Sequence, residues 1–267
     1  MGVIDLDWLQ LSISFLILGI PAFILWKYRT GLNRKLFSAT LRMVLQLLFV
    51  GFYLQYLFEY DHPLINISWI LVMVVVADFA TLDRSDLKRT KSLLIPIFLA
   101  TFFGIVLIDL FFLELVINLP KFLAAQYAIP ITGMVLGNCL RSNVIGIHSF
   151  YYSVKENRER YRFYLALGAS RKEAVFPFFK EALKRSANPT LATMATIGLV
   201  SLPGMMTGQI LSGSSPLIAI KYQIMIMLAI FSGTVLSVYL GIRISNKFVF
   251  DSADNLDESI FKPEKES

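Results

Sequence analysis

Long apolar stretches with few or no charges restrict the fold of this sequence more than any other feature. Residues 6–26, for example, carry no charge after Asp7. About 20 residues of helix cross a hydrocarbon core of roughly 30 Å. A chain that is 56% hydrophobic and 16% charged is too apolar for one soluble domain. We therefore predict an all-α polytopic membrane protein with about seven transmembrane helices, at residues 6–26, 36–58, 64–79, 93–115, 127–147, 189–211 and 217–241.

The basic residues supply an independent test of that count, because Lys and Arg collect in cytoplasmic loops. Of the 25 Lys and Arg residues, all but four lie in every second loop between the predicted spans or in the C-terminal tail. This distribution predicts an outside N-terminus and a cytoplasmic C-terminus. Because these residues lie between apolar blocks, they indicate topology and contact with membrane lipid, and no nucleic acid. We expect a transmembrane domain over residues 1–250 and a polar, disordered cytoplasmic tail over residues 251–267.

The sixth predicted span is interrupted by Pro203 and Gly204. A broken helix in lipid is tolerated mainly where protein or a water-filled cavity surrounds it. The break is therefore either a substrate site or a kink that improves packing. We predict that the substrate pathway is formed by the break, by the polar and sulfur-containing side chains that follow it, and by one amide side chain on each of two other spans. These residues are Gln46, Asn138, Pro203, Gly204, Met205, Met206, Thr207 and Gln209.

A basic segment at residues 149–188 separates the fifth and sixth spans. Helix formers over residues 156–167 precede Gly168, which suits a helix end, and Ser170 and Glu173 form an S-x-x-E capping box. The segment therefore predicts a helix, a tight turn and a second helix. It is either a docking segment for an ATP-binding subunit or an amphipathic helix held to anionic lipid. The predicted coupling residues are Ala166, Leu167, Gly168, Ala169, Ser170, Arg171, Lys172 and Glu173.

Three charged residues lie inside predicted spans at a similar depth: Arg42, Asp78 and Arg141. A charge at the bilayer centre costs about 2.5–3.5 kcal/mol, so such residues pair, line a cavity or reach for the surface. We predict that Asp78 pairs with Arg42 or Arg141. The alternative is that both arginines extend to the headgroups.

Several chemistries find no support in the sequence. It lacks a G-x-x-x-x-G-K-[S/T] phosphate loop, so any ATPase must be a separate chain, and it lacks a nucleophile and base pairing typical of an enzyme. Carboxylates that would suit ferric iron are not clustered. The methionines of the sixth span are either soft ligands or core filler, and metal ligands remain unassigned.

Residues 198–211, with Gly213, Pro216, Ala219 and residues 222–224 after them, resemble the signature of the FetB/YbbM-type ABC permeases. The pattern at residues 166–170, continued at Ala174, Pro177, Ala182 and Pro189, resembles the coupling segment of that family. Thr40, Arg42, Gln46 and Gly51 are similar to another of its helices, whereas Cys139 and Arg141 depart from its pattern.

The resemblance covers most of the chain and is strongest over residues 165–224. It implies the permease subunit of an exporter of iron or a related metal, in a bacterial inner membrane. It also implies a homodimer joined to ATPase subunits that use ATP and Mg²⁺. The alternatives are an ATP-independent carrier or channel, and an ABC permease for a non-metal small solute.

Overall fold

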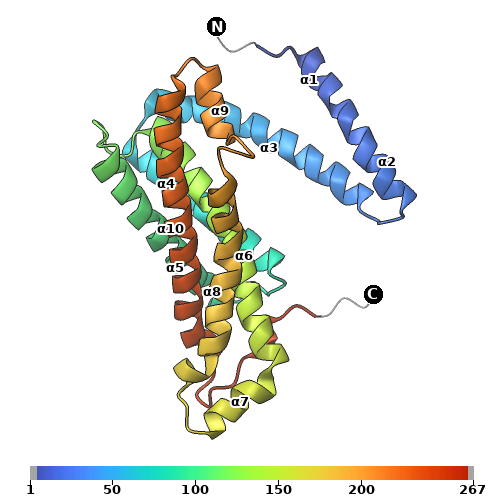
Figure 1. Ribbon diagram of the computed structural model, residues 1–267, viewed down its shortest axis with the longest axis vertical. Coiled ribbons are helices and arrows are strands. Elements are labelled where there is room, and N and C mark those ends of the chain that lie inside the picture. Colours follow the sequence, from blue (N-terminus) through green and yellow to red (C-terminus); the bar gives the residue numbers. More distant parts are fainter. Residues whose placement is uncertain (1–4, 264–267) are drawn as a thin grey trace.

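A computed structural model describes residues 5–263, which form helices and no β-strand (Figure 1). The N-terminal helices are α1 (Trp8–Ser14), the 3-10 helix η1 (Phe15–Leu18), α2 (Gly19–Lys27), α3 (Asn33–Tyr60), α4 (Pro63–Arg84), α5 (Lys91–Asp109) and the π-helix η2 (Leu110–Val116). They are followed by α6 (Ala125–Glu156), α7 (Arg158–Ala166), α8 (Arg171–Thr196), α9 (Gly204–Leu211), α10 (Pro216–Val249) and the 3-10 helix η3 (Glu258–Ile260).

The expected all-helical membrane fold is confirmed. Within residues 5–263, five helices are long and apolar enough to cross a membrane: Trp8–Lys27, Asn33–Tyr60, Pro63–Arg84, Lys91–Val116 and Pro216–Val249. The other two predicted spans coincide with α6 and with the end of α8 plus α9. The count of seven and the orientation of the termini stay predictions.

The bundle is organised around α10, which packs along α5, α6 and α8 (Figure 1). Glycines allow α6 and α10 to approach closely. A Cβ atom built on Gly146 would lie 2.6 Å from Cγ1 of Val238, and one built on Gly233 would lie 2.8 Å from Cγ1 of Val135. Real Cβ atoms do not come so close, so larger residues at these two positions would force the helices apart.

Polar side chains buried between the helices bond to one another across the bundle. Thr101 Oγ1 on α5 donates to Asp78 Oδ1 on α4 at 2.9 Å. Asn143 Nδ2 on α6 donates to Ser237 Oγ on α10 at 2.8 Å. A third contact joins α6 to α5, where Thr132 Oγ1 donates to Asp109 Oδ2 at 2.6 Å.

The predicted ion pair of Asp78 with Arg42 or Arg141 is wrong. Asp78 is buried against Thr101, while both arginines are exposed and make no ion pair with any residue between 5 and 263. Their similar depth was inferred from position along each helix, and depth does not determine which way a side chain faces. Arg42 lies on an arm outside the bundle, and Arg141 faces a cavity.

Helices α1, α2 and α3 form this arm, which leaves the bundle at an angle (Figure 1). Leu57, near the end of α3, is the arm's buried residue within the described chain. It packs with Ala125 and Ile129 of α6, and the rings of Tyr53 and Trp69 lie 4.2 Å apart nearby. The arm is therefore attached at one end, and its apolar surface is available to lipid or to another chain.

Asp61 fixes the corner where the arm meets the bundle. Its carboxylate pairs with Lys121 Nζ at 2.7 Å and accepts hydrogen bonds from Ala125 N at 2.7 Å and Asn66 Nδ2 at 3.2 Å. Partial burial works against its ionised form, yet the bonds from Lys121, Ala125 and Asn66 hold the pKa of Asp61 below its usual value. One side chain thus joins α3, α4 and the start of α6.

The prediction of a disordered tail is wrong for residues 251–263, whereas residues 264–267 lie outside the described chain. Ile260 and Phe261 are buried in the same apolar cluster as Leu82, Leu87 and Tyr161. Composition alone suggested disorder because the tail has few apolar residues. Those few meet an apolar surface at the ends of α4, α6 and α7, which only the assembled bundle creates.

Replacing Asp61 by alanine should leave Lys121, Asn66 and the N–H of Ala125 without their shared acceptor. We expect a loss of about 1–3 kcal/mol in stability, measured as a lower Tm of the purified protein in detergent. Glu59→Gln is the matched control, because Glu59 is an exposed acid two residues away. Equal Tm values for Asp61→Ala and Glu59→Gln would contradict the role of this corner.

Candidate functional site

The predicted break in the sixth span is present. Helix α8 ends at Thr196, residues 197–203 are irregular, and α9 begins at Gly204. Gly198 has φ +88°, a left-handed conformation that favours glycine, and its N–H donates to Ser201 O at 2.9 Å. The backbone therefore turns between two helices instead of merely kinking.

A cavity of about 280 Å³ adjoins the break, between α6, α8, α9 and α10. Four of the predicted pathway residues line it: Asn138, Pro203, Gly204 and Met205. The other four do not: Gln46 lies on the arm, and Met206, Thr207 and Gln209 lie on α9 but outside the cavity lining. The other lining residues are Met134, Arg141, Ser142, Ile145, Pro189, Thr190, Thr193, Ile197, Ser201, Gln223, Ile226, Met227 and Ile230.

Sequence reasoning missed the contribution of α8 and α10 to this cavity. Thr190 and Thr193 on α8 lie one turn apart, and Gln223 is a lone amide near the start of α10. The sequence offered one signal for such a lining residue, namely a polar side chain isolated within an apolar stretch. Without the packing of the helices, nothing indicated that these residues face the same space as Asn138.

The cavity has both polar and apolar lining residues and carries positive charge. Arg141 is its charged lining residue, and no Asp, Glu, His or Cys side chain from residues 5–263 lines it. In the same part of the chain, no group of three or more His, Cys, Asp or Glu residues could hold a metal ion. Three methionines, Met134, Met205 and Met227, supply its sulfur atoms.

The predicted helix-turn-helix of the coupling segment is confirmed. Helix α7 ends at Ala166, Gly168 has φ +87°, and Ser170 and Glu173 form both bonds of a capping box at the start of α8. Hydrogen bonds from the side chain and backbone of Ser170 hold the pKa of Glu173 below its usual value. We call α7, residues 167–170 and the first two turns of α8 the elbow.

The elbow lies at the end of the molecule opposite α9 (Figure 1), and it exposes large apolar side chains. Phe163 is 60% exposed, Leu167 69% and Phe176 60%. Beside them, a groove of about 630 Å³ separates the elbow from the end of α10. Its basic lining residues are Arg171, Lys172, Arg243 and Lys247.

The profile of the uncharacterised protein family UPF0014 matches residues 8–250, which covers the arm, the cavity and the elbow. The chain belongs to this family. Several apolar helices and relatives that are membrane proteins make it an integral membrane protein.

Relatives of this UPF0014 protein occur in bacteria and plants. The UPF0014 membrane protein YjkA of Bacillus subtilis is 32% identical over 223 residues, 83% of this chain and 87% of YjkA. The probable iron export permease protein FetB of Escherichia coli is 29% identical over 92% of this chain and 93% of FetB. The protein ALUMINUM SENSITIVE 3 of Arabidopsis thaliana is 30% identical over 84% of this chain and 83% of its own length. No solved structure matches the chain.

The C-terminal tail of this family member is bound to the elbow. Tyr161 Oη on α7 donates to Asp254 O at 2.7 Å, and burial, with the charge of Asp254, raises the pKa of Tyr161 to about 12. Arg158 pairs with Glu258 at 2.6 Å, and Arg171 pairs with Asp254 at 3.4 Å. Both helices of the elbow are therefore attached to the tail.

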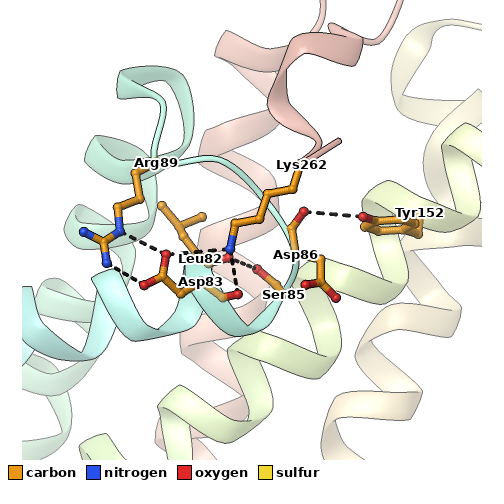
Figure 2. A network of polar contacts seen from close by, with 7 residues as sticks. All are labelled: Leu82, Asp83, Ser85, Asp86, Arg89, Tyr152 and Lys262. Carbon is orange, nitrogen blue, oxygen red and sulfur yellow. Dashed lines mark hydrogen bonds and ion pairs between the residues drawn. The ribbon is translucent and has the colours of Figure 1, made fainter. Parts of the chain in front are cut away.

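The same tail also contacts the turn between α4 and α5 (Figure 2). Lys262 Nζ donates to Asp83 O at 2.8 Å, and Arg89 holds the carboxylate of Asp83 from the other side. Tyr152 Oη on α6 donates to Asp86 O at 3.4 Å. Through Lys262, the tail thus joins the elbow to the end of α4.

Truncating the buried side chain of Ile260 to alanine should leave a cavity beneath the tail and cost about 2–4 kcal/mol locally. We expect faster hydrogen exchange over residues 251–263 and over α7 than in the unmodified protein. Ser259→Ala serves as the control, since Ser259 is exposed. Unchanged exchange in α7 after Ile260→Ala would show that the tail does not brace the elbow.

Proposed function

We propose that this UPF0014 protein is the permease subunit of an ABC transporter that exports iron or a related metal or metal complex. A separate ATP-binding subunit, which uses ATP and Mg²⁺, supplies the energy. The permease acts as a homodimer in the bacterial inner membrane. This chain itself is not an enzyme.

The observation that carries the proposal is the elbow. Exposed aromatic and aliphatic side chains surrounded by basic residues are typical of a docking surface with central anchors and a charged rim. Phe163, Leu167 and Phe176 supply the anchors, and the groove beside them supplies the positive charge. An acidic, concave surface on a nucleotide-binding subunit fits this arrangement.

A continuous helix runs from this docking surface to the cavity. Helix α8 is continuous from Arg171 to Thr196, 26 residues, or about 39 Å at 1.5 Å per residue. Its first two turns belong to the elbow, and Pro189, Thr190 and Thr193 near its other end line the cavity. Movement of the elbow would therefore move one wall of the cavity, while the irregular residues 197–203 absorb the change in direction.

Iron is the first candidate for the cargo because the relative FetB is named as a probable iron export permease. A permease for a non-metal small solute would share the same elbow and the same cavity. An ATP-independent carrier or channel would need the cavity and the break, but not the elbow.

Reversing the charge of Lys172, or replacing Leu167 by aspartate, should prevent co-purification with the ABC ATPase subunit. Loss of one anchor costs about 2 kcal/mol or more of binding free energy. Lys184→Glu is the matched control, because Lys184 is an exposed lysine further along α8. The proposal fails if Leu167→Asp and Lys172→Glu retain the ATPase as well as Lys184→Glu does.

Transport in vesicles separates the alternatives. With both subunits present, export of iron should require ATP. Flux without an ATPase would favour the carrier or channel, and ATP-dependent flux of other solutes alone would favour the non-metal permease.

A further inference from the structure

The cavity beside the break is much larger than a bare metal ion. Its volume is about 280 Å³. That volume suits a small organic molecule with several polar groups. The polar side chains that line the cavity come from three helices and the break: Asn138, Arg141 and Ser142 on α6, Thr190 and Thr193 on α8, Ser201 in the break, and Gln223 on α10.

Arg141 gives this space an uncompensated positive charge. It lies 16 residues along α6 from Ala125, about 24 Å from the start of the helix. No carboxylate among residues 5–263 pairs with it. A guanidinium at such a depth must face water, a cavity or an anion, because lipid solvates it poorly.

Acidic side chains are buried in the bundle, but they do not line the cavity. Asp78 accepts from Thr101 and Asp109 accepts from Thr132, both inside the packed core. Neither lines the cavity. Hard metal cations need oxygen donors such as these carboxylates. A bare cation in the cavity would instead meet the positive charge of Arg141, and the thioethers of Met134, Met205 and Met227 do not neutralise that charge.

We propose that the cavity binds a small polycarboxylate, which carries any metal as a negatively charged chelate. Arg141 binds a carboxylate with two parallel N–H···O bonds, the geometry for which a guanidinium is suited. The side-chain amides of Asn138 and Gln223 and the hydroxyl of Thr190 donate to the remaining oxygen atoms. The identity of this solute as the cargo rests on the function proposed above, whereas its binding to the cavity does not.

Binding can be measured with the purified protein in lipid nanodiscs, using ferric citrate, iron-free citrate and ferrous ion as probes in calorimetry. We expect ferric citrate or citrate to bind and ferrous ion not to bind. Arg141→Gln should weaken carboxylate binding about 10- to 100-fold, the effect of losing a charged hydrogen bond. Arg141→Lys should retain part of it, since lysine keeps the charge without the planar geometry.

Arg42→Gln is the matched control, because Arg42 is the other arginine within a predicted span and lies on the arm, outside the cavity. It should leave binding unchanged. Preference for ferric citrate over citrate would show that the chelate is the ligand, and equal binding would show that the carboxylate suffices.

Three results would overturn the proposal: ferrous ion binding that Arg141→Gln preserves or strengthens, equal losses for Arg42→Gln and Arg141→Gln, or no binding of either citrate form. If Arg141→Gln does not fold, the probe preference of the unmodified protein and the Arg141→Lys variant decide the matter. Co-purification of the ATPase is a separate measurement. A permease that keeps its ATPase but does not bind carboxylates refutes this proposal alone.

Discussion

Hydrogen bonding between helices holds the bundle together, because a bilayer core offers no water to buried polar groups. Thr101 bonds to Asp78, and Asn143 bonds to Ser237, so α4, α5, α6 and α10 each contribute a polar group to one buried region. Thr101 Oγ1 also lies 3.5 Å from Ser237 Oγ, which connects the two pairs. Apolar contacts alone would orient these helices less specifically, since lipid tails compete for the same surfaces.

The same constraint explains where the backbone is irregular. Residues 197–203 interrupt the helical path between α8 and α9, and Ile197, Ser201 and Pro203 of this segment line the cavity. A break facing lipid would leave its peptide groups unsatisfied. The break, the cavity and the unpaired Arg141 therefore lie together in one part of the bundle.

Helix α8 links the cavity to the elbow at the far end of the molecule. Helix α8 supplies both the capped turn at Ser170 and the cavity wall at Thr193. The tail bonds to Tyr161 of the elbow and to Asp83 at the end of α4. A force on the elbow would thus reach α8 directly and the rest of the bundle through the tail.

The sequence by itself determined the helical membrane class, the capped turn from Gly168 to Glu173 and the break before Gly204. These features depend on local periodicity, capping and backbone conformation, which neighbouring residues specify. Tertiary structure decided which side chains come together: Asp78 accepts from Thr101, Arg141 and Gln223 line the same cavity, and Ile260 is buried at one end of the bundle. Depth along a helix can be read from residue position, but the direction in which a side chain points is fixed only when the helices pack.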